Sequence, residues 1–450
     1  MPKTIIHSVK LFDGEEIHEN ATVVFDQVSG TIDSVSTTSG PPQATGDAEV
    51  IDGTGKTLLP GLIEGHMHCW DIHMPEGVGN SDVLRMTMRA GVTTVCDFHS
   101  DPYCVNNLRD LIEKETTKAK SKGKDGRVHM ADLKTALLAA TIQGGWPKPV
   151  VLSHHHTDPA RLEARVAKWP NLTVETVPEY IKDHKANGAN YIKLMQENCC
   201  SLKFETNSVP VASLELQKAV VDCAHEHGLP AVGHALSVDM TEVLLKAGVD
   251  GLAHMIIDQA PTENLMQLYK QSGAFLIPTF CALSALTTEL QDYRERFAAI
   301  YDRLDMFDDV VINRNTLLGV MHIASQQNPK ASIEYGVENV KQLMAQGGDI
   351  VAGTDNIGGV PGAALGPGLW MELTIYIERC GMTTKQALAS CTSTTARRFG
   401  FHDRGRVAHG LRADLLLVNG DLFAGKGVEA LWEEDQGIAA VWREGIRGPH

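Results

Sequence analysis

The sequence lacks the marks of a disulfide-stapled or membrane-spanning protein. Its 450 residues contain nine cysteines, an odd number with no CxxC spacing, so they do not suggest a disulfide framework. No run of about 18 apolar residues occurs, and the first residues lack the basic start and apolar stretch of a secretory signal. We therefore expect a cytoplasmic protein without a membrane partner.

Positive charge is also in short supply. The 40 Lys and Arg residues are outnumbered by 56 Asp and Glu, which gives a formal net charge of −16 and argues against a nucleic-acid partner. Histidine, by contrast, is abundant at 19 residues, and it is the commonest metal ligand in proteins. The length and the 43% hydrophobic content predict one large catalytic core with a smaller satellite.

Both ends of the chain read as short strands separated by turn signals. The expected strands are Thr4–Leu11, Ala21–Phe25, Ala48–Ile51, Ala413–Val418 and Gly437–Arg443. Both ends share this pattern of short strands and turns, whereas the residues between them follow a different pattern. We therefore predict a composite β-sandwich domain built from residues 1–56 and 404–450.

The middle, residues 57–403, alternates apolar runs of strand length with amphipathic helices, the pattern of parallel strands joined by crossovers. The helices are marked by caps at Ser213, Ser237 and Thr262, and the stretch 280–345 reads as a helical insertion. Eight strands are expected: Thr57–Ile63, Val92–Phe98, Thr135–Thr141, Ala189–Met195, Leu229–Gly233, Val249–Ala253, Ala274–Thr279 and Asp349–Gly353. This arrangement predicts an α/β fold, a (β/α)8 barrel.

Polar residues that end these strands are the candidates for chemistry, because barrel enzymes place catalytic groups at the carboxyl ends of strands. His66 and His68 are separated by one residue, so a strand presents both imidazoles on one face, as a shared metal ion requires. Single candidates end four other strands: Lys193, His234, His254 and Asp355. Taken alone, each also has an ordinary role, such as a paired lysine, a backbone-bonded histidine or a turn-capping aspartate.

The motifs PGLIEGHMH and GTDN, with the lysine strand and the two single-histidine strands between them, resemble the amidohydrolase superfamily. The resemblance is to its imidazolonepropionase-like branch, including the prolidase-type and ochratoxin-hydrolysing members. It extends to RGRVAHGLRADLLLV, which is similar to the segment where that family returns from the barrel to its β-sandwich.

The resemblance implies a two-metal site in which a carboxylated Lys193 bridges the ions. His66, His68 and Asp355 would hold one ion, and His234 and His254 the other. Zinc is the expected metal, with manganese, cobalt or iron able to use the same ligands. A water activated between the ions would attack a polarised carbonyl, while Asp355 serves as general base and then general acid.

Residues beyond the second, third and fourth strands are candidates for substrate contact: His99, Tyr103, Trp146 and Glu197. Glu197 belongs to the polar segment 196–201, where several relatives have a glycine-rich loop, so the substrates of those relatives need not apply here. Within that segment we interpret Cys199 and Cys200 as buried or rim thiols. The consecutive histidines 154–156 point in different directions and favour a solvated loop over a metal site.

We predict a hydrolase that cleaves an amide-like C–N bond of a small molecule, and we expect a homo-oligomer. Hydrolysis of a lactone or another ester is the main alternative, because it uses the same activated water. A decarboxylase-like or deaminating member and a non-catalytic scaffold are further alternatives, and the complete set of candidate ligands disfavours the scaffold.

Overall fold

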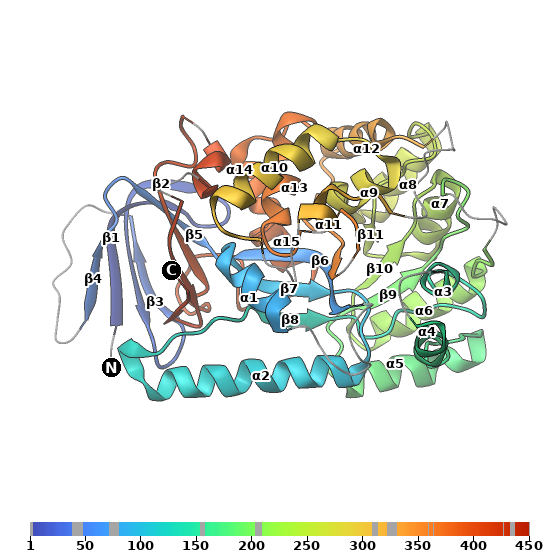
Figure 1. Cartoon of the computed structure of the whole chain (residues 1–450), viewed down its shortest axis with the longest axis horizontal. Coiled ribbons are helices and arrows are strands. Elements are labelled where there is room, and N and C mark those ends of the chain that lie inside the picture. Colours follow the sequence, from blue (N-terminus) through green and yellow to red (C-terminus); the bar gives the residue numbers. More distant parts are fainter. Residues whose placement is uncertain are drawn as a thin grey trace.

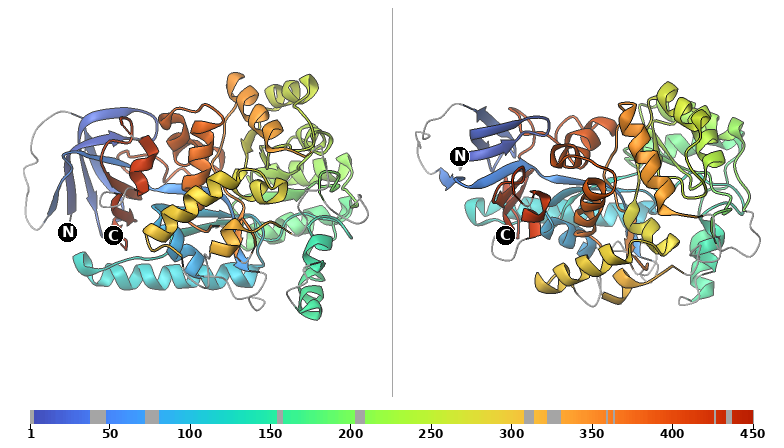
Figure 2. Two further views of the ribbon diagram at one scale, coloured as in Figure 1. Left: turned by 45° about the horizontal axis from the view of Figure 1, so that its top comes forward. Right: turned by 90° about the horizontal axis from the view of Figure 1, so that it is seen from above.

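The computed structural model describes residues 3–37, 48–71, 81–153, 158–202, 209–307, 314–321, 331–358, 360–362, 364–425, 427–432 and 437–449. The chain forms one mixed sheet at one end of the molecule, which also holds both termini, and two parallel sheets surrounded by helices (Figures 1 and 2).

The mixed sheet is assembled from strands near the two ends of the chain. β5 pairs parallel with β1 and antiparallel with β14, so an N-terminal strand lies beside a C-terminal one. The sheet order is β16-β15-β14-β5-β1-β2-β3, with β4 on β1. Its strands are β1 (Lys3–Phe12), β2 (Ile17–Asp26), β3 (Ile32–Ser36), β4 (Glu49–Asp52), β5 (Lys56–Pro60), β14 (Leu415–Asn419), β15 (Ile438–Arg443) and β16 (Ile446–Arg447).

The central part of the chain forms two four-stranded parallel sheets, which confirms the α/β class. One has the order β13-β6-β7-β8, with β6 (Leu62–Asp71), β7 (Val92–Asp97), β8 (Asp132–Thr135) and β13 (Asn356–Gly358). The other has the order β12-β11-β10-β9, with β9 (Ile192–Met195), β10 (Ala231–His234), β11 (Gly251–Ala253) and β12 (Phe275–Ile277). Isolated parallel bridges join Ala140, which follows β8, to Leu194 of β9, and Leu276 of β12 to Ile350, which precedes β13.

Three predicted strands differ from the observed ones. The run 57–63 is divided, because Lys56–Pro60 belongs to the mixed sheet and only the residues from Leu62 onward enter a parallel sheet. The run 135–141 follows β8 instead of forming it, and Leu137 has a left-handed φ of 57° that interrupts an extended chain. The run 349–353 makes one bridge at Ile350, because the amides of Val351 and Ala352 donate to different partners, Leu276 and Ser390.

Helices connect and cover the parallel strands. Ser213, Ser237 and Thr262 stand at the N-caps of α6, α7 and α8, as predicted, and helices α9–α12 account for the described part of the 280–345 insertion.

In Figure 1 the long helix α2 runs along the lower edge, whereas α10 and α12 lie in the upper part of the molecule. The helices up to α8 are α1 (Ser81–Arg89), α2 (Pro102–Ser121), α3 (Lys148–Leu152), α4 (Pro159–Val166), α5 (Val177–Ala186), α6 (Leu214–Glu226), α7 (Val238–Ala247) and α8 (Glu263–Ser272). The later helices are α9 (Phe280–Thr287), α10 (Gln291–Arg303), α11 (Arg314–Leu318), α12 (Ile333–Ala345), α13 (Gly368–Glu378), α14 (Thr384–Ser390) and α15 (Ser393–Arg398). Among the described helices, none combines the length and the apolar character needed to cross a bilayer.

One buried cluster joins the two parallel sheets. It takes side chains from strands or strand ends of both, with Phe98, Tyr191, Phe275 and Phe399 at its centre. The ring centroids of Phe98 and Tyr191 lie 4.9 Å apart, and those of Tyr191 and Phe399 4.8 Å apart. Aromatic packing of this kind fixes the strand ends above it.

An ionic network ties β8 to the segment that leads back into the mixed sheet. The carboxylate of Asp132 lies 2.5 Å from Arg404 and 3.1 Å from Arg412, and Arg412 also lies 3.1 Å from Asp414. The Arg404 side chain is only 2% exposed. Although burial alone would favour the neutral acid, the charges of Arg404 and Arg412 hold the pKa of Asp132 well below its usual range.

We expect Asp132→Asn to lower the free energy of unfolding at pH 7 by about 3 kcal/mol, because it leaves two buried guanidinium groups without their shared carboxylate. A carboxylate with a depressed pKa stabilises the folded state above its unfolded pKa, about 3.9, and loses this contribution as the pH falls toward the folded pKa. Urea unfolding of both proteins should therefore show a difference that shrinks below about pH 4.

Lys218→Ala serves as the control, because the Lys218–Asp222 pair has side chains 60% and 55% exposed. It should change the stability by less than about 0.5 kcal/mol at every pH. An equally small effect of Asp132→Asn at pH 7 would show that the network does not hold the two parts together.

Candidate metal centre

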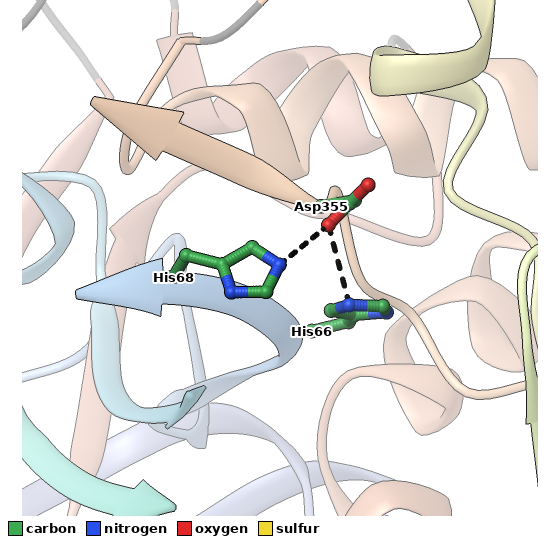
Figure 3. A group of neighbouring side chains, drawn as sticks. All are labelled: His66, His68 and Asp355. Carbon is green, nitrogen blue, oxygen red and sulfur yellow. Dashed lines mark hydrogen bonds and ion pairs between the residues drawn. The ribbon is translucent and has the colours of Figure 1, made fainter. Parts of the chain in front are cut away.

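His66, His68 and Asp355 form a compact trio at neighbouring strands. The two histidines alternate along β6, and Asp355 comes directly before β13, which pairs with β6. Oδ1 of Asp355 lies 3.2 Å from Nε2 of His66 and 2.9 Å from Nε2 of His68 (Figure 3). One ligand atom from each residue lies within 4.8 Å of the others, a spacing that a single metal ion can bridge.

The buried carboxyl group of Glu64 connects the strand that carries His66 to the segment that carries Asp355. It accepts hydrogen bonds from the backbone N–H of His66 at 3.1 Å and of Thr354 at 2.9 Å, and from the Thr354 hydroxyl at 3.0 Å. Burial raises the pKa of Glu64 to about 8. The sequence analysis missed this residue, although Glu64 stands two positions before His66 and therefore on the same face of the strand.

The other three candidate ligands face the trio from the second sheet. Lys193 is in β9, His234 ends β10, and His254 follows β11. The ring centroids of His234 and His254 are 4.5 Å apart, and those of His66 and His254 are 5.0 Å apart. His254 also lies 4.0 Å from Asp355. The structure thus brings the six residues expected from the sequence to one place.

The electrostatics of this place suit metal ligands. Burial lowers the pKa of His234, and it lowers the pKa values of His66 and His254 well below the usual range, with a further contribution from neighbouring positive charge. Burial also lowers the pKa of Lys193 to about 7. The imidazoles are therefore largely uncharged near neutral pH, where the Lys193 amine is partly uncharged, and neutral imidazoles offer the lone pairs that bind metals.

Several of these buried polar atoms have no hydrogen-bond partner within the described part of the chain. They are Nζ of Lys193, Nε2 of His234, and Nδ1 of His66 and of His68. Native proteins pair nearly all buried polar groups, so a cluster of unpaired ones indicates a missing ligand. Four imidazoles, a carboxylate and an amine able to become a carbamate fit one or two divalent ions such as zinc.

Left-handed backbone also occurs at this site. His254, Thr279 and Asp355 have left-handed φ angles of 79°, 57° and 56°, a conformation that residues with a Cβ seldom adopt. The Thr279 hydroxyl contacts Nδ1 of His254 at 2.7 Å, which fixes the orientation of that ring. Strain of this kind persists where the surrounding structure enforces it, and it clusters at functional sites.

A cavity of about 180 Å³ opens beside the six residues, all of which line it. His99 and Trp146, two of the predicted substrate contacts, are also in its wall. The Trp146 ring stacks on His234 with centroids 5.3 Å apart. Most of the remaining wall is apolar and includes Trp70, Val150, Val151, Met195, Met321 and Ile357.

The other two predicted contacts lie elsewhere. Tyr103 is 78% exposed because it stands in the first turn of α2, and it lines a side hollow formed with Trp70, His99, Arg165 and Trp169 instead of the cavity. Glu197 is buried, and its carboxylate accepts from the N–H groups of Cys199 and Leu236 at 2.6 and 3.0 Å.

Glu197 therefore lies beside a candidate ligand without lining the cavity. Its Oε2 lies 3.7 Å from Nε2 of His234, beyond hydrogen-bond distance. In the same segment Cys199 is buried and Cys200 exposed, whereas the histidines 154–156 lie outside the described residues.

Comparison with known proteins agrees with this geometry. The sequence profile described as the Amidohydrolase family matches residues 57–446. The imidazolonepropionase of Deinococcus radiodurans is 22% identical over 411 residues, which cover 87% of this chain and 84% of that protein.

Solved structures show the same fold over nearly the whole chain. A Xaa-Pro dipeptidase with methionine bound in its active site superposes with a TM-score of 0.71 at 20% identity, over 99% of each chain. The A. niger ochratoxinase has a TM-score of 0.66 at 18% identity, over 99% of this chain and 95% of its own. Since the profile spans most of the sequence and the motifs it shares converge in space, this chain belongs to the amidohydrolase family.

Proposed function

We propose that this protein is a metal-dependent amidohydrolase that cleaves an amide-like C–N bond of a small organic molecule. The observation that carries the proposal is the trio His66, His68 and Asp355, whose ligand atoms lie within 4.8 Å of one another beside an apolar cavity. The relatives described as a Xaa-Pro dipeptidase, an imidazolonepropionase and an ochratoxinase support a hydrolase of this type.

In this proposal His66, His68 and Asp355 would hold one zinc ion, and His234 and His254 would hold a second. Lys193, as a carbamate formed when its uncharged amine captures carbon dioxide, would supply an anionic ligand to both. When bound, ions of this kind lower the pKa of a water molecule and polarise a carbonyl group. We further propose that the two parallel sheets are the halves of one (β/α)8 barrel, and that residues 1–56 and 404–450 form the β-sandwich beside it.

Asp355 performs the proton transfers. Its side chain is 24% exposed and lines the cavity, so its carboxylate can reach a bound substrate. It accepts the proton released by the attacking water and donates it to the leaving nitrogen, first as general base and then as general acid. Glu64 holds Asp355 in register through Thr354, and the apolar wall excludes competing water.

A substrate panel tests the reaction class. We expect the zinc-loaded protein to hydrolyse members of a panel of N-acyl amino acids and their amides, dipeptides and cyclic imides faster than lactones or phosphotriesters. A chelator should abolish turnover and added zinc should restore it. Ester or lactone cleavage without any amide cleavage would contradict the proposed bond type, and full turnover after complete metal removal would contradict the proposed chemistry.

We expect Lys193→Ala to reduce metal content from about two ions per chain and to lower kcat/KM at least about a hundredfold, because the bridging anion is lost. Elemental mass spectrometry measures the metal, and intact mass measures the carbon dioxide adduct in the parent protein. A short carboxylic acid such as formate should restore part of the activity of Lys193→Ala. Full metal content and full turnover without added acid would rule out a bridging role.

Asp355→Asn should lower kcat for an unactivated anilide by about a hundredfold to ten-thousandfold, the usual worth of a general acid–base group. The loss should be smaller for a 4-nitroanilide, since its nitrogen leaves with less need of a proton. Asp101→Asn, which changes only the N-cap of α2, is the matched control. Equal losses on both anilides would show that Asp355 acts as a ligand alone.

A further inference from the structure

Two N–H donors stand side by side in the cavity wall. Trp70 is on β6 two residues beyond His68, so it continues the face that carries His66 and His68. His99 follows β7, the strand that pairs with β6. Both side chains are buried, at 8% and 3% exposure, both line the cavity, and their ring centroids lie 6.3 Å apart.

The hydrogen bond to His99 fixes which ring nitrogen is the donor. The backbone N–H of Ala139 donates to Nδ1 of His99 at 3.0 Å, so the proton of the neutral ring is on Nε2. Burial lowers the pKa of His99 well below its usual range, in keeping with a neutral ring. The indole Nε1–H of Trp70 can only donate.

Both donors lack an acceptor. Neither Nε2 of His99 nor Nε1 of Trp70 has a hydrogen-bond partner among the described residues. A buried donor without a partner is costly, and two of them on one cavity wall indicate a ligand that supplies an acceptor.

The surroundings select the kind of acceptor. Apart from the six candidate metal ligands, every described residue that lines the cavity other than His99 is apolar. A carboxylate placed there would lose its hydration and gain only neutral donors. Trp70 and His99 also line the side hollow, where the guanidinium of Arg165 packs 5.2 Å from the centre of the Trp70 ring, but neither Arg165 nor Lys168 lines the cavity.

We propose that Trp70 and His99 form a two-donor subsite that binds an uncharged oxygen acceptor of the substrate. The inference rests on the proposed function and narrows it. The substrate is a neutral amide with an apolar body and, besides the carbonyl that is attacked, a second carbonyl or ether oxygen. Trp70 and His99 position this second oxygen and thereby determine specificity, whereas the bond cleavage belongs to the metal centre.

The test measures binding of three uncleavable sulfonamides by calorimetry with the metal-loaded protein. N-(phenylsulfonyl)glycine N-methylamide carries a neutral second carbonyl, N-(phenylsulfonyl)glycine carries a carboxylate, and N-butylbenzenesulfonamide carries neither. We expect the methylamide to bind at least about tenfold more tightly than the other two, since each of the two donors contributes a hydrogen bond worth up to about tenfold in affinity.

Variants of Trp70 and His99 test whether these two side chains cause the difference in affinity. Trp70→Phe and His99→Leu should each weaken the methylamide about tenfold and N-butylbenzenesulfonamide less than about twofold. His99→Gln should retain most of the affinity, because its amide can donate from nearly the same position as Nε2. Trp442→Phe is the matched control, since it removes a buried indole N–H that also lacks a partner but lies in the mixed sheet.

Equal weakening of both neutral probes by Trp70→Phe and His99→Leu would overturn the inference, because it would show a merely structural role. Tighter binding of the carboxylate than of the methylamide, or no binding of any probe to the folded protein, would overturn it as well. These outcomes are independent of hydrolysis, so a protein that cleaves no amide can still show the donor pair, and an active amidohydrolase can fail to show it.

Discussion

The hydrogen bonds of one buried carboxyl group join the residues of the candidate metal centre. Glu64 bonds the backbone of His66 and both the amide and the hydroxyl of Thr354, and so it places Asp355 opposite the two histidines of β6. The amide of Asp355 itself donates to the carbonyl of His66 at 2.7 Å. The left-handed backbone at Asp355 is held by these bonds, because nothing in the local sequence favours it strongly enough alone.

Burial then gives the assembled side chains their chemical character. An exposed lysine would carry charge and repel a cation at neutral pH, and an exposed histidine would do so below about pH 6.5, but desolvation lowers the pKa of Lys193 to about 7 and keeps the buried imidazoles neutral. Burial also leaves several polar atoms without hydrogen-bond partners among the described residues. Such atoms destabilise the fold unless a ligand bonds to them. The same reasoning links the metal centre to the wall of the cavity, where Trp70 and His99 leave two further donors unpaired.

The candidate ligands could be predicted from the sequence because they obey simple periodicities. Period-two spacing places His66 and His68 on one face, and parallel strands bring their carboxyl ends to one rim. The boundaries of the strands were harder to predict from the sequence. The apolar run 57–63 is continuous, although at Gly61 the chain passes from the mixed sheet into β6. A Cβ at Gly61 would meet the Thr93 side chain at 2.3 Å, a tertiary contact that no local pattern contains.

Two of the predicted substrate contacts lie outside the cavity wall, because their positions depend on the directions of loops and helix starts. Tyr103 stands in the first turn of α2 and is exposed, and the Glu197 carboxylate accepts from backbone amides. Glu64 and Trp70, by contrast, follow the same two-residue spacing as His66 and His68. Their signal was present in the sequence, and only the three-dimensional partners reveal their roles.

The most direct test of whether these residues hold zinc is anomalous X-ray diffraction from crystals of the active, zinc-loaded protein. The data are recorded on both sides of the zinc absorption edge. We expect an anomalous peak within bonding distance of His66, His68 and Asp355. We expect a second peak beside His234 and His254, with density for a carbamate on Lys193 between the two peaks. Crystals of active protein that show zinc elsewhere and none at these residues would contradict this expectation.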